Sequence, residues 1–457
     1  MRLSPHDLAA PFHRNPEGEG RMRLAWIRTF ALAALFLPAA QTVAGQSTGS
    51  TEGAPLSLTA AVDEALQNNP ELIALRRQYD AARQRPAQDR FLMAPSFEAQ
   101  IWQWPINTLN PLNTGMYMVT ISQDLPGRGK RQLKVALAQK DAELSANEIA
   151  IRGRDVVEQV KRTYAELFVS RRAIEVQGQS IGLVRQLADV STAKYAAGRA
   201  PQQDVLRAVV EISKLQIDLV TRGERAQLAE AELNTLLARP PQARIGTLAE
   251  PPEDVALPSP EELQQLALLR HPELTASRLG VERAQAALNV TEREYKPDFM
   301  VGGGYMLMPR DRDAWTASVG ISWPTARWAR GRLDAQKAEA EANIEAARAG
   351  QRAAENRIRL AVQDAYIRVK SAGQRAALLR TTILPQSEQT LEVSRVAYQT
   401  DRVDFLALLD NQRVLVEAQL DYEEALSELE QARADLERAV GVDLPATTTA
   451  DATSERR

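Results

Sequence analysis

Two very long stretches of the chain repeat apolar residues at helical spacing. Between about residues 131 and 196 there is no proline, and an apolar stripe runs through Val156, Val160 and Leu167. The second stretch, from about 330 to 397, has the same helical spacing of apolar residues. At 1.5 Å per residue, each stretch predicts a helix of roughly 100 Å. Helices of this length need neighbours throughout, so we expect coiled-coil-like packing.

Four short stretches alternate apolar and polar positions with a period of two, which predicts β-strands. One face of each stretch is apolar, and the other carries mainly small or polar side chains and methionine. Their length, about 9–11 residues, is that of a tilted strand that crosses a bilayer. Tryptophans near the ends suit an interfacial girdle, so we expect one face to meet lipid and the other water. The strands are expected at about 95–104, 115–124, 298–308 and 314–323.

Four such strands cannot form a closed barrel by themselves. A barrel needs about eight strands, and an open sheet edge leaves backbone groups without partners in lipid. Several copies of the chain must therefore pool their strands, and three copies would supply twelve.

The chain consists of two similar halves in tandem. Four motifs of the first half return in the same order in the second, which indicates a duplication. They are Asn69-Pro70-Glu71-Leu72 and His271-Pro272-Glu273-Leu274, Pro95-Ser96-Phe97 and Pro297-Asp298-Phe299, Ile121-Ser122 and Ile321-Ser322, and Val190-Ser191 and Val393-Ser394, spaced by 202, 202, 200 and 203 residues. The predicted organisation is a first repeat over 46–240 with a hairpin tip at about 196–201, a proline-rich linker over 241–258, a second repeat over 259–442 with a tip at about 399–403, and a disordered tail over 443–457.

The N-terminal segment 1–45 has the features of a secretory signal. Arginines precede a short apolar run at 29–37, and small residues follow it. A single membrane anchor is the alternative, although the run is short for a span. The start at Met1 or at Met22 stays open.

Composition excludes several classes of function. The chain has 457 residues, a net charge of −3 and no cysteine. It therefore lacks disulfides, thiol nucleophiles and cysteine metal sites, and it has no basic surface for nucleic acid. A catalytic triad would need His271, which occupies the place of Asn69 in the other half and is better explained as structural. We predict no enzyme activity and no cofactor.

The tandem halves, the Asn-Pro-Glu-Leu opening, the paired strands and the helical hairpins resemble the TolC-like outer-membrane efflux proteins. The hairpin sequence 194–206 and the segment 123–127 are similar to family motifs, and the resemblance covers about 55–442. It implies a mixed α and β membrane protein whose homotrimer combines a 12-stranded barrel with an α-helical tunnel of coiled-coil hairpins.

The resemblance also implies a place and partners. Such a channel sits in outer-membrane lipid with its helical part in the periplasm. It meets a periplasmic adaptor and an inner-membrane pump, in a tripartite efflux system or a type I secretion system, and conducts substrates passively. A secreted coiled-coil protein without a channel is the alternative, but it leaves the paired strands unexplained.

Candidate site residues lie at the predicted tips and entrance. The tips carry Gly198, Arg199, Asp401 and Arg402, which either serve adaptor docking or only satisfy a tight turn. The resemblance places Asp410 and Tyr398 at the pore entrance. A companion aspartate of the family is replaced by Ala407, which puts a doubled aspartate ring in doubt.

Methionines suggest a cargo. Four of them fall on the strand face that we assign to the lumen, and thioethers are soft ligands that suit copper(I) and silver(I). The alternative is that methionine fills space between strands. Heavy-metal cations and drug-like organic molecules both remain candidate cargoes. The four residues are Met116, Met118, Met306 and Met308.

Overall fold

The computed structural model describes residues 55–444, apart from 105, 108–109, 111–112, 251–256 and 401. The predicted signal segment 1–45 and residues 445–457 lie outside this part. Within the described ranges, no helix is both long and apolar enough to span a membrane. Asp443, which we expected in a disordered tail, is described and forms an ion pair of 3.0 Å with Arg154.

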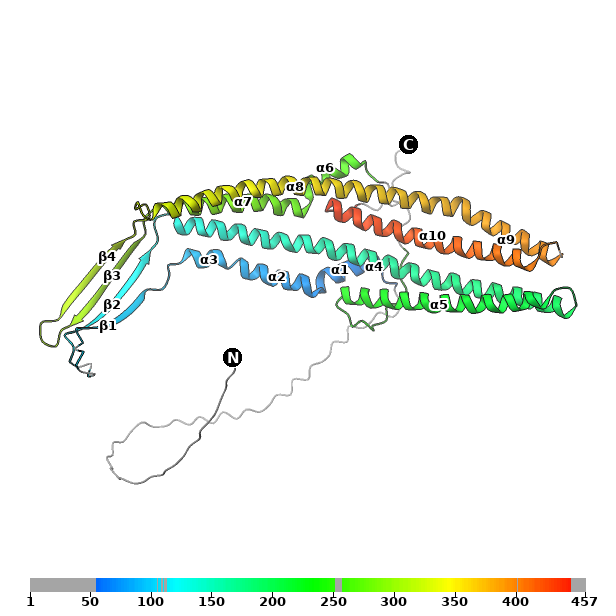
Figure 1. The fold of residues 1–457 in the computed structure, drawn as a ribbon, viewed down its shortest axis with the longest axis horizontal. Helices are drawn as coiled ribbons and strands as arrows, with labels where there is room; N and C mark the ends of the chain where they lie inside the picture. Colours follow the sequence, from blue (N-terminus) through cyan, green and yellow to red (C-terminus); the bar gives the residue numbers. More distant parts are fainter. Residues whose placement is uncertain are drawn as a thin grey trace, which may run out of the picture. The chain divides into compact units, whose positions relative to one another are not determined.

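Both halves contain the same succession of elements (Figure 1). Two or three short helices lead into two strands, and two long helices follow. The first half contains α1 (Leu58–Asn68), α2 (Pro70–Ala82), α3 (Arg85–Arg90), β1 (Ser96–Trp102), β2 (Met116–Leu125), α4 (Lys130–Ala196) and α5 (Gln202–Leu236). The second half contains α6 (Pro260–Arg270), α7 (Pro272–Arg293), β3 (Phe299–Leu307), β4 (Ala314–Ile321), α8 (Arg330–Leu378), η2 (Leu379–Ile383), α9 (Leu384–Gln399) and α10 (Phe405–Val440).

The first long stretch forms one helix, as its apolar stripe predicts. α4 has 67 residues, which corresponds to about 100 Å of helix. The second stretch is helical from Arg330 to Gln399, as expected, but a π-helical turn interrupts its α-helical hydrogen bonding. α8 gives way to the π-helical turn η2 before α9, whose second residue is Pro385. Proline has no N–H and clashes with the carbonyl four residues earlier, and a π turn accommodates both effects.

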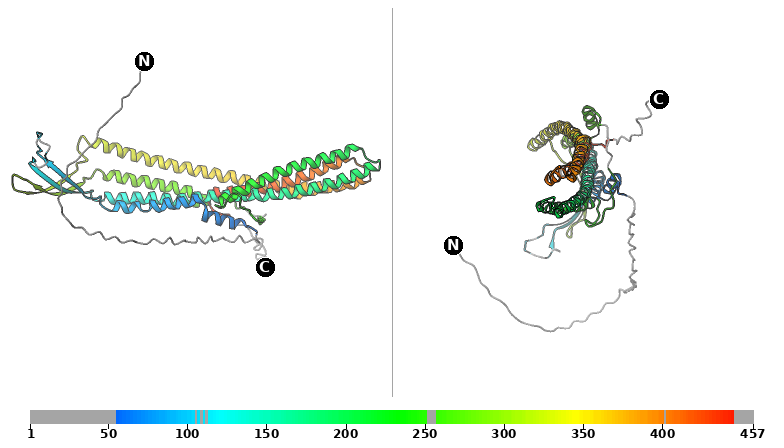
Figure 2. Two further views of the ribbon diagram at one scale, coloured as in Figure 1. Left: turned by 90° about the horizontal axis from the view of Figure 1, so that it is seen from below. Right: turned by 90° about the vertical axis from the view of Figure 1, so that its right-hand side faces the viewer.

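The four strands form one antiparallel sheet in the order β1-β2-β3-β4. β2 pairs with β3, so the central strand pair joins the two halves of the chain. α4 runs alongside elements of both halves (Figures 1 and 2). On the sheet side it packs against α2, α3 and α7, and further along it packs against α5 and α10.

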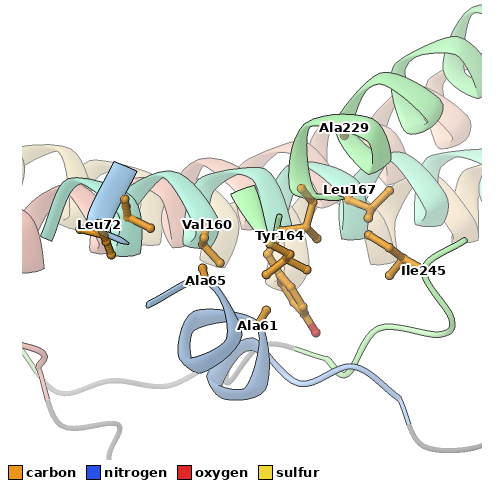
Figure 3. Packing of buried hydrophobic residues seen from close by; sticks show 11 residues of the cluster. Ala61, Ala65, Leu72, Val160, Tyr164, Leu167, Ala229 and Ile245 are labelled. Atoms are coloured by element: carbon orange, nitrogen blue, oxygen red, sulfur yellow. The ribbon is translucent and has the colours of Figure 1, made fainter. Parts of the chain in front are cut away.

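Buried apolar clusters stabilise each half in the same way. In the first half, α1, α4 and α5 meet around Tyr164 and Val160 (Figure 3). The Tyr164 hydroxyl lies 2.7 Å from the carbonyl oxygen of Leu56 and 2.8 Å from that of Ala249. In the second half, α6, α8 and α10 meet around Val362. A third cluster joins α4, α5, α9 and α10 near the hairpin tips.

The motif that opens each repeat splices two helices end to end. The Asn69 side chain accepts from the N–H of Glu71 at 2.9 Å and donates to the carbonyl of Leu236, the last residue of α5. His271 likewise accepts at Nδ1 from the N–H of Glu273 at 3.1 Å, and its ring hydrogen-bonds the backbone of Arg438 near the end of α10. α2 therefore follows α5, and α7 follows α10, along α4.

Burial lowers the pKa of the His271 imidazole from its ordinary value of 6.5. The ring is therefore neutral at pH 7, as an acceptor at Nδ1 requires. The structural interpretation of this histidine from sequence agrees with this geometry.

Candidate functional site: a two-faced sheet and two helical tips

One face of the sheet is apolar and exposed. The register aligns Ala99, Val119, Tyr305 and Trp315 in one row across all four strands. Neighbouring rows on this face add Phe97, Ile121, Val301, Val319, Phe299 and Ile321, and all of these large side chains are exposed. A continuous apolar surface of this kind marks a face that meets lipid or a partner.

The opposite face carries small and polar side chains. One row contains Ser96, Ser122, Gly302 and Ser318, and the hydroxyl oxygens of Ser96 and Ser122 lie 2.6 Å apart. The next row contains Glu98, Thr120, Gly304 and Thr316. The alternation predicted from sequence therefore holds across the whole sheet, and its polar face suits water.

Methionines occupy the polar face. Met118 of β2 lies directly opposite Met306 of β3, and Met116 lies opposite Trp102. Met308 follows β3 immediately. Sequence analysis left out Met300, which shares this face because it pairs with Asp124 and Gly320.

An ionic junction around one buried lysine joins the sheet to the long helices. Lys130, the first residue of α4, donates to Glu294 at 3.0 Å and to Asp298 at 2.8 Å. Asp298 also accepts from the N–H of Gly127 at 2.7 Å, and a Cβ at Gly127 would come within 2.4 Å of the Pro297 carbonyl oxygen. Glycine is therefore required where the segment between β2 and α4 meets the segment between α7 and β3.

In the sheet and in the helices near the tips, the first half of the chain forms one outer edge and the second half forms the other. β1 and β4 are the edges of the sheet, while α5 and α9 lie at opposite sides of the α4–α10 pair. Both helical edges carry stripes of exposed apolar side chains. The first stripe, on α5, contains Leu206, Val209, Val210, Ile217, Val220 and Leu228. The second stripe, on α8, η2 and α9, contains Leu360, Ile367, Leu378, Ile383, Val393 and Val396.

The two hairpin tips are tight, exposed turns. Gly198 has a φ of +70°, and the N–H of Arg199 donates to the carbonyl of Lys194 at 2.8 Å. At the second tip the N–H of Arg402 donates to the carbonyl of Ala397 at 2.9 Å. The side chains of Arg199 and Arg402 are exposed, and Asp401 lies outside the described residues. Turn geometry explains Gly198, but it does not require an arginine at either tip.

Tyr398 lies inside the helical end rather than on an open surface. Its ring packs against Phe405 with centroids 5.7 Å apart, and the Lys194 ammonium lies 4.1 Å from the ring centroid. The same ammonium donates to the Tyr398 carbonyl oxygen, which ties α4 to α9. The family motif located this tyrosine, but sequence analysis did not identify Lys194 as its partner.

Asp410 is exposed and belongs to an ion-paired group. Its carboxylate lies 3.3 Å from Arg413, whose guanidinium also binds Glu211 of α5 through two nitrogens. These hydrogen bonds lower the pKa of the Glu211 carboxyl, so it is ionised at neutral pH. Sequence analysis missed Arg413 and Glu211, because a separation of 202 residues leaves no local pattern.

No other ligand cluster stands out. Across the described parts of 55–444, no three His, Cys, Asp or Glu side chains gather in a geometry that could hold a metal ion. The candidate site therefore consists of the two faces of the sheet, the exposed apolar stripes on the edge helices, and the charged helical end near Asp410.

Comparison with known proteins connects these surfaces to a family. The family model described as outer membrane efflux protein matches residues 61–239 and 263–442, one match in each half. The cobalt-zinc-cadmium resistance protein CzcC of Cupriavidus metallidurans is 26% identical over 426 residues, which cover 90% of this chain and 98% of that protein.

Solved structures share the fold. A membrane protein from Pseudomonas aeruginosa superimposes with a TM-score of 0.72 at 20% identity, over 86% of this chain and 92% of the other. CusC superimposes with a TM-score of 0.73 at 17% identity, over 84% and 92% of the two chains.

Proposed function

Since the chain belongs to the outer membrane efflux protein family, we propose that it conducts heavy-metal cations passively out of the cell, as one protomer of a homotrimer. The family consists of outer-membrane efflux channels, and the chain is a channel of this kind rather than an enzyme. Our proposal concerns the cargo of this channel, its oligomeric state and its partners.

The observation that carries the proposal is the position of the free edges. An edge from the first half lies on one side at every level, and an edge from the second half lies on the other. Such a protomer suits head-to-tail association, which forms a ring when the rotation between neighbouring copies closes. Three copies would supply twelve strands, with the apolar face toward lipid and the polar face toward a water-filled lumen.

The length of the helix α4 supports contact with periplasmic partners. α4 begins at the sheet and extends about 100 Å toward the tips. We propose that Gly198, Arg199 and Arg402, together with Asp401, dock a periplasmic adaptor that connects the channel to an inner-membrane pump. The exposed arginines would then contact acidic groups of the adaptor.

The proposed cargo rests on the relative CzcC, whose name assigns it to cobalt, zinc and cadmium resistance. Asp410 adds a physical argument, because threefold repetition of an exposed carboxylate in a narrow entrance attracts cations. Arg413 moderates this charge but is itself held by Glu211. The group of three side chains therefore has a net charge of about −1 per protomer at neutral pH.

The proposed function predicts metal sensitivity without the channel. Deleting the gene should lower tolerance to cobalt, zinc and cadmium, and the purified trimer should give stepwise conductance in a planar bilayer. Asp410→Asn should reduce cation preference in a salt gradient, because each entrance loses three negative charges.

Asp80→Asn is the matched control for Asp410→Asn. Asp80 also lies 3.3 Å from an arginine at helical spacing, Arg77, but on α2. This variant should keep the reversal potential of the wild type. If deletion caused sensitivity to hydrophobic antibiotics alone, the proposed metal cargo would be contradicted. If Asp410→Asn left the reversal potential unchanged, the proposed role of Asp410 at the entrance would be contradicted.

The docking proposal predicts a separate defect. Arg199→Glu combined with Arg402→Glu should weaken adaptor binding about tenfold, or ~1.4 kcal/mol, because attraction to acidic groups becomes repulsion. Pull-down with the adaptor and metal export by cells would measure the loss. Arg270→Glu, which changes another exposed arginine at a helix end, should leave binding unchanged, and normal binding by the double variant would refute docking at the tips.

A further inference from the structure

The methionines of the described chain are confined to the sheet and its neighbourhood. Methionine usually fills irregular gaps in apolar cores. Here none of the methionines between residues 55 and 444 belongs to a buried cluster, and these clusters consist mainly of Leu, Val, Ile and Ala. Gap filling in the helical core therefore does not explain the six residues Met93, Met116, Met118, Met300, Met306 and Met308.

Strand pairing places two of these side chains next to each other. Met118 and Met306 are direct partners in the register of β2 and β3, on the polar face. Directly opposite residues in an antiparallel pair have Cβ atoms roughly 5 Å apart, and each methionine sulfur lies a further two bonds beyond its Cβ. The two sulfurs can therefore approach one common point.

Two more thioethers lie at the same end of the sheet. Met116 precedes Met118 by two residues and so shares its face, and Met308 follows Met306 by two residues at the end of β3. The sheet thus presents a pair of sulfurs with further sulfurs one position away, toward the loops between the strands.

The described strand rows around these sulfurs carry no positive charge. The row of Met118 and Met306 ends in Gln100 on β1 and Ala314 on β4. The nearest carboxylate in the adjoining row, Glu98, accepts a hydrogen bond of 2.5 Å from Gln100. No Lys or Arg occupies either row within the described strands. A cation at the sulfurs would therefore meet no positive charge in these rows.

We propose that Met118 and Met306, assisted by Met116 and Met308, form a binding site for a soft monovalent cation, Ag⁺ or Cu⁺, on the lumen face of the sheet. Neutral thioethers prefer these ions, whereas carboxylates prefer harder divalent ions. The lumen position rests on the proposed channel, but the binding itself does not. The site extends the cargo class from divalent cations to soft monovalent ones.

Thioether ligation has a distinctive pH dependence. A thioether carries no proton that a metal must displace, so affinity for Ag⁺ stays constant between about pH 5.5 and 7.5. Binding by histidine or by coupled carboxylates would weaken as the pH falls through this range. The pH profile therefore identifies the ligand type independently of mutagenesis.

The experiment measures Ag⁺ binding to the full-length, detergent-solubilised protein in chloride-free buffer, with silver nitrate as the probe. Met118→Leu combined with Met306→Leu should weaken binding at least about tenfold, since leucine preserves volume but removes the sulfur. Met93→Leu, which alters an exposed methionine outside the strands, should bind as the wild type does. Zn²⁺ in excess should not displace Ag⁺, because neutral thioethers prefer the softer ion.

Failure of the site and failure of the channel give different results. Equal Ag⁺ affinity in the wild type and the double leucine variant, or loss of affinity at pH 5.5, overturns the site whether or not the protein conducts. Sulfur-dependent Ag⁺ binding without conductance in a planar bilayer supports the site and instead overturns the proposed channel. An oligomer of wild-type size establishes that the leucine variant is folded.

Discussion

Replacing Lys130 with methionine is expected to lower the free energy of unfolding by about 2 kcal/mol. The substitution leaves Glu294 and Asp298 as neighbouring carboxylates without the cation between them. A hydrogen bond to a charged group contributes about 1.5–3 kcal/mol, and we expect an intermediate value because the two remaining carboxylates are 35% and 43% exposed. The midpoint of urea unfolding, followed by circular dichroism, measures the change.

Lys140 provides the matched control on the same helix. It also links α4 to α7, through Glu282 at 2.8 Å, but its side chain is 30% exposed, compared with 4% for Lys130. Lys140→Met should therefore destabilise the protein much less than Lys130→Met, because an ion pair in contact with water contributes little to stability. Equal unfolding midpoints for the two variants would show that the junction does not stabilise the connection between sheet and helices.

Introducing glutamates into the α5 stripe is expected to convert the proposed trimer into monomers. Ile217 and Val220 are 66% and 74% exposed in the isolated protomer, and we place them against α8 and α9 of the next copy. Burying an unpaired carboxylate costs several kcal/mol, and ring symmetry repeats this cost at every interface. Light scattering of the Ile217→Glu, Val220→Glu double variant in detergent measures the mass.

The control for this change is Leu269→Glu, because Leu269 is 72% exposed on α6, outside both stripes. It should remain trimeric. A stable wild-type monomer with its full strand content would contradict the ring, and a trimeric double variant would exclude this edge from the interface.

Local patterns were sufficient for the elements of the fold. The alternation around Val119 and Tyr305 predicted strands and their faces, and the register places these two residues side by side. The recurrence of Asn69 as His271 predicted equivalent structural roles, and both side chains cap a helix. These predictions hold because side-chain period and capping depend on residues close in sequence.

Long-range partners could not be predicted in this way. Lys130 meets Asp298 across 168 residues, and the exposed Asp410 owes its setting to Arg413 and Glu211. Nothing in the spacing of these residues indicates a contact. The stripe from 330 to 397 likewise hid the π turn, because apolar periodicity continues through the segment before Pro385 and the proline acts on the backbone.

In the proposed channel, the two splices at Asn69 and His271 would divide the helical wall into two parts whose lengths can change separately. Between the splices and the hairpin tips, the helical wall consists of α5, α10 and the adjoining parts of α4, α8 and α9. Between the splices and the sheet, α2 and α7 take the places of α5 and α10. Matched insertions of seven residues keep a coiled-coil seam in phase. Such insertions between the splices and the tips would lengthen the reach toward the pump while the sheet, its junction and both caps kept their sequence. Homologues that serve wider or narrower envelopes could therefore differ by whole heptads in that part of the helical wall alone.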